Sequence, residues 1–148
     1  MLLRLRGIPA RVALGYLPAE AVRLAGSARA PDVFIVDAHL RTPGDGLRLV
    51  CDLRTRSASR HAAIILRHPP EDVQVASMAL DLGANDIVST ECTEAEFRVR
   101  LTAQIRRKSD ADRLRDSVVD GLRLAVIDPL TGLYNRRYAT PHLARMLT

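Results

Sequence analysis

The sequence is poor in aromatic residues, since Phe, Trp and Tyr make up only 3% of its 148 positions and tryptophan is absent. Because 47% of the residues are nevertheless hydrophobic, we expect a core of leucine, valine, isoleucine and alanine. Lysine is also scarce: Lys108 is the only one, and the other cations are arginines. The two cysteines, Cys51 and Cys92, do not have a metal-site spacing, so free thiols are expected.

The chain also lacks an apolar run near the roughly 20 residues that a membrane-spanning helix needs. Residues 1–5 are too few and too charged for a signal peptide, so we expect a cytoplasmic protein. The net charge of +5 permits a nucleic-acid-binding surface, but the arginines are interleaved with acidic residues. No basic block carries the aromatic residues that stack on single strands. The composition therefore favours neither a membrane nor a nucleic-acid partner.

Short apolar runs alternate with segments of helical periodicity along most of the chain. The run 33–36 is continuously apolar and ends at Asp37, which is typical of a parallel strand buried on both faces. We expect further strands at 10–14, 63–66 and 86–88, and helices at 18–25, 47–54, 75–82 and from Thr93 onward. Strands that alternate with helices through short connections predict an α/β fold with a parallel sheet covered on both faces.

The helical pattern that starts at Thr93 hardly pauses before Ile127. Thr93 and Glu96 have the spacing of a capping box. The first half carries an apolar face that should pack on the sheet, formed by Phe97, Leu101 and Ile105. The second half shifts its apolar stripe to Ala111, Leu114, Val118, Leu122 and Ala125. This stripe indicates a short two-chain coiled coil, weakened by Gly121 on the seam, and an amphipathic helix within one chain is the alternative.

The stretch 128–138 carries the most specific motif of the chain. Pro129 cannot continue a helix and Gly132 follows in a turn, so we expect a break and a new helix from about Asn135. The motif D-x-L-T-x-L-x-N-R-R, which opens GGDEF catalytic domains, is matched by Asp128, Leu130, Thr131, Leu133, Asn135, Arg136 and Arg137. The chain therefore resembles diguanylate cyclases, which make cyclic di-GMP from two GTP. It holds no Gly-Gly pair, so only the start of such a domain is expected.

The resemblance extends upstream to the second, receiver-like domain and linker helix of PleD-type response regulators. It implies a flavodoxin-like (CheY-like receiver) domain at 1–107, a linker or stalk helix at 108–127, and an N-terminal stub of a GGDEF domain at 128–148. The first receiver strand has no counterpart, because residues 1–5 read as the end of a helix. In the 2-1-3-4-5 strand order that strand is central, so a fold without it would have a gap in its sheet. We expect that the sequence is part of a longer chain; the alternative is that another copy or segment fills the gap.

A working receiver accepts a phosphoryl group on an aspartate, with Mg²⁺ held by carboxylates and with a hydroxyl and a lysine nearby. The resemblance places Asp37 at the acceptor position. Arg67 stands at the hydroxyl position, Thr90 stands at the lysine position, and the acidic pair has no counterpart. We therefore expect Asp37 to be a degenerate acceptor without a metal, paired with Arg67. A phospho-accepting receiver with Asp37 as the acceptor is the alternative.

The resemblance implies a regulatory role, with no catalytic residues in this fragment. Such an adaptor would form a homodimer that brings two GGDEF domains together. Its other partners would be a phosphorylatable receiver and the GGDEF domain of the same parent, with a sensor histidine kinase upstream. The parent would use Mg²⁺ and GTP and be inhibited by cyclic di-GMP, whereas the fragment would need no cofactor.

Two further expectations concern single residues. Arg11 stands where an adaptor arginine of the family contacts cyclic di-GMP. Asp128 is expected to pair with Arg136 or Arg137 and so to fix the angle of the turn.

A DNA-binding response regulator is a third hypothesis for the chain. It is disfavoured because the GGDEF opening stands where a helix-turn-helix would follow the receiver.

Overall fold

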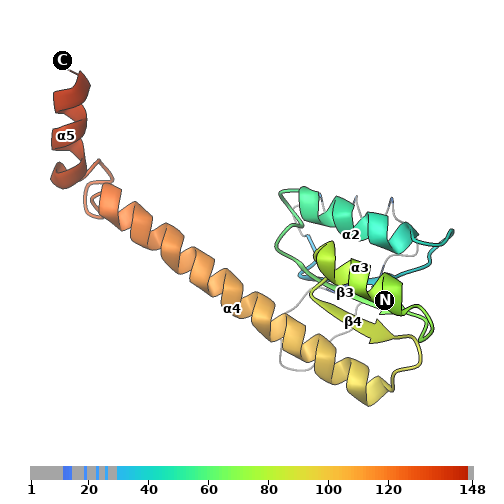
Figure 1. Cartoon of the computed structure of the whole chain (residues 1–148). Helices are drawn as coiled ribbons and strands as arrows, with labels where there is room; N and C mark the ends of the chain where they lie inside the picture. Colours follow the sequence, from blue (N-terminus) through green and yellow to red (C-terminus); the bar gives the residue numbers. More distant parts are fainter. Residues whose placement is uncertain (1–11, 15–18, 20–22, 24–25, 27–29, 147–148) are drawn as a thin grey trace. The chain divides into compact units, whose positions relative to one another are not determined.

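The computed structural model describes residues 12–14, 19, 23, 26 and 30–146 (Figure 1). The strands are β1 (Val12–Leu14), β2 (Val33–Asp37), β3 (Ala63–His68) and β4 (Asp86–Ser89). The helices are α2 (Asp45–Thr55), α3 (Val73–Asp81), α4 (Glu94–Val126) and α5 (Arg136–Met146). Most of the helix expected at 18–25 lies outside the described residues. The chain divides into two compact units, Met1–Lys108 and Ser109–Thr148.

The first unit contains a parallel sheet with the strand order β1-β2-β3-β4. This alternation of strands and helices confirms the α/β class. The expected gap beside the run 33–36 is absent, because β1 pairs directly with β2 and Val12 lies opposite Val33. An open edge on β2 would leave its backbone N–H and C=O groups unpaired, and β1 supplies their partners. The prediction of a gap is therefore wrong.

Side chains of the strands alternate between two cores on opposite faces of the sheet. On one face Phe34 and Val36 pack with α2 and α3, as the period of two along a strand requires. On the other face Val33 and Ile65 pack against the first part of α4, together with Leu101 and Ile105. Figure 1 shows α2 and α3 on one side of β3 and β4, and α4 on the other. The sheet face predicted for α4 is confirmed.

The start of α4 is fixed by a cap and by ion pairs. The Glu96 N–H donates to the Thr93 hydroxyl over 3.2 Å, as one half of a capping box requires. The Glu96 carboxylate does not complete the box; it accepts a bond from Arg100 Nε at 2.9 Å. Arg100 also pairs with Asp86 of β4 at 3.2 Å, and Glu96 and Asp86 together raise the pKa of Arg100. These contacts join the helix to the sheet.

Arg54, in the last turn of α2, joins three segments at the amino-terminal edge of the sheet. Its guanidinium donates to the carbonyl oxygens of Gly83, Arg60 and Ala62 over 2.7–2.9 Å. It also donates to the side-chain oxygen of Asn85 at 2.5 Å. Partial burial lowers the pKa of Arg54. The helix is thereby tied to the loops that lead into β3 and β4.

The second unit begins within α4 and leaves large apolar side chains in solvent. Leu114, Val118 and Leu122 are 67%, 54% and 65% exposed. The predicted stripe is therefore uncovered in a single chain. Among the described residues, the structure contains no helix that is both long and apolar enough to cross a membrane.

We predict that Arg54→Ala lowers the free energy of unfolding by about 3 kcal/mol, because several carbonyl groups lose a charged donor. Arg48→Ala on the exposed side of the same helix is the matched control and should change stability by less than about 0.5 kcal/mol. Urea unfolding followed by circular dichroism measures both values. Equal effects of the two substitutions would show that the Arg54 contacts do not stabilise the fold.

Candidate functional site

Three side chains predicted from the sequence meet at the carboxyl edge of the sheet. Asp37 ends β2, Arg67 lies near the end of β3, and Thr90 directly follows β4. The parallel register places Asp37 beside Arg67, and Arg67 Nη1 lies 3.3 Å from Asp37 Oδ1. The N–H of Thr90 donates to the carbonyl oxygen of His68 over 2.8 Å. The carboxyl ends of neighbouring parallel strands are where α/β sheets place their sites.

Asp37 has one enclosed and one accessible oxygen. Its side chain is 48% exposed as a whole, yet Oδ1 is buried and has no hydrogen-bond partner. The nearby guanidinium of Arg67 supplies opposite charge without a hydrogen bond of good geometry. Among the described residues, no group of three His, Cys, Asp or Glu side chains could hold a metal ion. The cation that faces the Asp37 carboxylate in the structure is the guanidinium of Arg67.

The loop after β2 is tied to the start of α3 by a histidine. His39 Nε2 lies 2.5 Å from Asp72 Oδ2, and the N–H of Gly44 donates to His39 Nδ1 over 3.3 Å. Both ring nitrogens of His39 are therefore engaged, one by Asp72 and the other by the loop in front of α2. Asp72 occupies the N-cap of α3 but makes no side-chain cap bond, because its carboxylate is turned to His39. This contact closes over the same edge of the sheet.

Asp45 and Gly46 shape the loop in front of α2. A Cβ at Gly46 would lie only 2.1 Å from the carbonyl oxygen of Asp37, so no other residue fits this close approach. The Thr42 hydroxyl donates to Asp45 Oδ1 over 2.5 Å, and bonds from Thr42 lower the pKa of Asp45. The loop therefore holds the backbone of Asp37 in place.

The second predicted constellation is the turn between α4 and α5. Asp128 Oδ1 accepts bonds from the N–H groups of Leu130 and Thr131 at 3.1 and 2.9 Å, and from the Thr131 hydroxyl at 3.0 Å. These donors, with the Thr131 N–H first, lower the pKa of Asp128. The structure does not contain the expected ion pair with Arg136 or Arg137. That expectation is wrong, because the turn's own donors already satisfy the carboxylate.

Asn135 caps both helices that meet at this turn. Its side-chain Nδ2 donates to the carbonyl oxygen of Ala125 in the last turn of α4 over 2.7 Å. Its Oδ1 accepts the N–H of Tyr138 in the first turn of α5 over 2.9 Å. Its backbone N–H donates to the carbonyl oxygen of Val126 over 2.8 Å. One residue thus satisfies groups at two helix ends that would otherwise need water.

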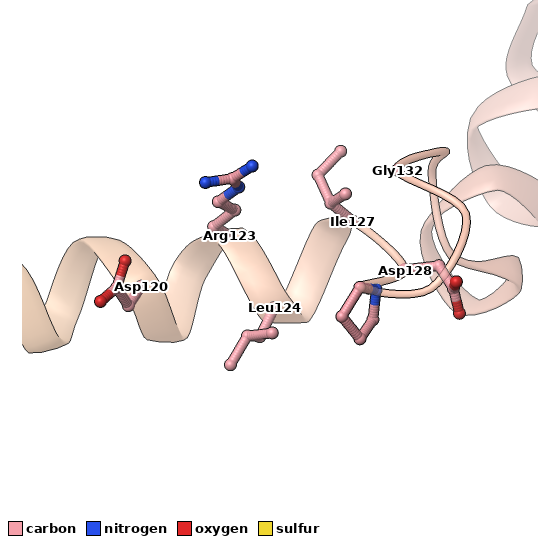
Figure 2. Close-up of a pocket in the computed structure, with 7 residues that line it drawn as sticks. Asp120, Arg123, Leu124, Ile127, Asp128 and Gly132 are labelled. Atoms are coloured by element: carbon pink, nitrogen blue, oxygen red, sulfur yellow. The ribbon is translucent and has the colours of Figure 1, made fainter.

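The remaining predicted residues of this motif do not converge. Leu130 is 92% exposed, and the side chain of Arg137 is exposed on α5. A pocket of about 330 Å³ lies beside the turn. Figure 2 shows its lining residues Asp120, Arg123 and Ile127 on the helix, and Asp128 and Gly132 in the loop. Its charged lining residues are of both signs, so no single ligand charge is indicated. Arg11 lies outside the described residues.

Sequence reasoning missed two of these contacts. His39 and Asp72 are 33 positions apart, and no local pattern joins them. Asn135 could have been identified as an N-cap, because an asparagine before the first turn is a common start signal. The hydrogen bond from Asn135 to the carbonyl oxygen of Ala125 could not have been predicted, because it depends on how the turn folds.

We predict that the pKa of Asp128 lies below its ordinary value of 3.8 and rises when Thr131→Val removes the hydroxyl donor. Because the folded pKa is depressed, this carboxylate stabilises the turn above its ordinary pKa, and that support is lost as pH falls through the folded value. Carbon-13 NMR titration of the Asp128 carboxyl measures the shift. Thr140→Val, on α5, is the control and should leave the titration unchanged. A native value at or above 3.8 contradicts the described turn.

Comparisons with known proteins bear on the fold and on sequence similarity. No protein-family model matches the chain. The response regulator PleD of Caulobacter vibrioides is 40% identical over 112 residues, which cover 76% of this chain and 24% of that protein. The chain therefore spans about a quarter of the curated relative that it matches.

Solved structures share the fold. The receiver domain of a sensor histidine kinase from Pseudomonas aeruginosa, solved with a magnesium ion in its active-site cleft, has a TM-score of 0.55 and 25% identity. The match covers 64% of this chain and 76% of that domain. An adenylate cyclase from Rhodopirellula baltica has a TM-score of 0.63 and 15% identity over 74% of this chain and 79% of that one. The chain is therefore a response-regulator receiver domain with a flavodoxin-like fold, similar in sequence to PleD.

Proposed function

We propose that the chain is a non-catalytic adaptor from a PleD-type diguanylate cyclase. Its receiver-like domain, residues 1–107, associates with a second copy. The helix at 108–127 connects this domain to a GGDEF domain whose first residues are 128–148. The adaptor would control the synthesis of cyclic di-GMP from two GTP by holding two catalytic domains at a productive distance.

The ion pair between Asp37 and Arg67 carries this proposal. Phosphoryl transfer to a carboxylate builds negative charge on the phosphoryl oxygens, and receivers offset it with a metal ion and a lysine. Here the cation nearest to Asp37 is already engaged with the acceptor itself, at 3.3 Å. A phosphoryl group on Asp37 would have to displace Arg67 without gaining a new counter-charge from Thr90. The arrangement supports a domain that signals by association.

The turn at 128–135 supports the proposed output. The matched motif residues Asp128, Thr131 and Asn135 build one hydrogen-bonded joint between α4 and α5. A joint that satisfies its own polar groups is stiff, so a movement of α4 would reach the segment that follows. The catalytic activity, its Mg²⁺ and GTP, and inhibition by cyclic di-GMP belong in this proposal to the parent protein.

The proposed partners follow from the same role. They are a second copy of the chain, a phosphorylatable receiver of the same parent, and a sensor histidine kinase acting on that receiver in the cytoplasm. A contact of Arg11 with cyclic di-GMP stays a prediction. The alternative, phosphorylation of Asp37 itself, is favoured by one observation: its side chain is 48% exposed at the carboxyl end of β2.

The uncovered stripe on α4 leads to a test of the dimer. We predict that the chain has twice the mass of a monomer in light scattering, and that Val118→Glu makes it monomeric by placing a charge in an apolar contact. Val119→Glu is the matched control, because Val119 is adjacent, is 62% exposed and lies off the stripe. It should leave the dimer intact. A monomeric native chain, or equal effects of both substitutions, argues against association through α4.

A further inference from the structure

We infer that the second part of α4 pairs with the same segment of another copy in parallel, along a nearly straight seam in which Leu122 replaces Gly121. The inference rests on the proposed dimer and specifies its interface. The seam is defined as Ala111, Leu114, Val118, Leu122 and Ala125, all within the second unit.

The spacing of the seam residues is the first argument. Successive members are separated by three, four, four and three residues. A pure heptad would continue from Val118 to position 121, but Gly121 has no side chain to fill a hole there. The step of four to Leu122 makes the distance from Ala111 to Leu122 equal to 11 residues. Heptads wind helices left-handed and 11-residue repeats wind them right-handed, so a mixture leaves the pair almost straight.

The exposure of the seam is the second argument. Leu114 and Leu122 are 67% and 65% exposed, although both are large and apolar. A Cβ built on Gly121 would meet nothing within 4 Å, so no close approach within the chain explains this glycine. Gly121 therefore lies beside the contact line, where its cost is only a loss of helix propensity.

Charge complementarity indicates both the partner and its direction. When Ala111 is taken as position a, Asp110 occupies position g and Arg115 occupies the following position e. In a parallel pair a g residue faces the next e residue of the other helix, so Asp110 would meet Arg115 of the second copy. Arg115 also pairs with Asp112 on its own helix, which holds its guanidinium at the flank of the seam. The occupant of this face is therefore a second copy of the same chain.

Disulfide cross-linking tests the seam. The background carries Cys51→Ser and Cys92→Ser, which remove both native thiols. Single cysteines are then placed by Val118→Cys, Leu122→Cys, Gly121→Cys and, as a control on the opposite side of α4, Asp120→Cys. A disulfide forms only when the two Cα atoms come within about 7 Å, so in a parallel pair a residue links to its own copy only at the seam. We expect Val118→Cys and Leu122→Cys to link at least about fivefold faster than the other two variants.

The outcomes separate the inference from the proposed function. A native chain that is monomeric in light scattering overturns both. A dimer in which Gly121→Cys links as fast as Leu122→Cys, or faster, keeps the adaptor proposal but shows a regular heptad and overturns the straight seam. A dimer in which only one of the Val118→Cys and Leu122→Cys variants links, or neither does, shows that the helices are antiparallel or that the contact lies elsewhere, and the inference fails.

Discussion

The salt bridge between Asp37 and Arg67 is the constraint from which the functional interpretation follows. Its strength is modest, because a partly exposed ion pair contributes about 1 kcal/mol or less to stability. Its importance lies in charge: the carboxylate that a receiver would phosphorylate already faces a cation 3.3 Å away. The register of β2 and β3 fixes this contact, since Asp37 and Arg67 are direct neighbours across the sheet. The fold therefore places a cation of the same chain beside the carboxylate that ends β2.

The same edge is held by contacts that cross between loops. His39 joins Asp72 at the start of α3, and Gly46 allows the backbone of α2 to touch the carbonyl group of Asp37. In the other unit, Asp128 and Asn135 form a joint from short hydrogen bonds. Both constellations use polar groups to fix loops at helix ends, where backbone groups lack intrahelical partners. The proposed adaptor role would depend on such fixed connections between the elements.

The buried strands and the sheet-facing side of α4 could be predicted from the sequence. Continuous apolar runs such as 33–36 and the spacing of Leu101 and Ile105 are local signals of burial. The strand neighbours were harder, because pairing of β1 with β2 depends on backbone groups that any sequence carries. The 2-1-3-4-5 strand order of receivers predicted a gap beside β2. In the structure β1 pairs with β2 instead, because the backbone groups at the edge of β2 need hydrogen-bond partners.

Only part of the candidate site could be predicted from the sequence, because some of its contacts join residues that no local pattern connects. Asp37 and Arg67 lie at the carboxyl ends of successive parallel strands, so their meeting at one edge could be anticipated. Asp128 was expected to form an ion pair with an arginine. Its carboxylate accepts hydrogen bonds from the nearer N–H groups of Leu130 and Thr131 instead, which costs less side-chain entropy. The bond from Arg54 to Asn85 joins residues far apart in sequence, and no local pattern encodes it.

Incubation of the chain with acetyl phosphate and Mg²⁺, followed by intact-mass measurement, tests the central claim most directly. The account predicts an unchanged mass, because the Arg67 guanidinium already lies 3.3 Å from the Asp37 carboxylate. A gain of one phosphoryl group that is lost in Asp37→Asn would contradict the account. It would show that this receiver still carries out phosphoryl transfer.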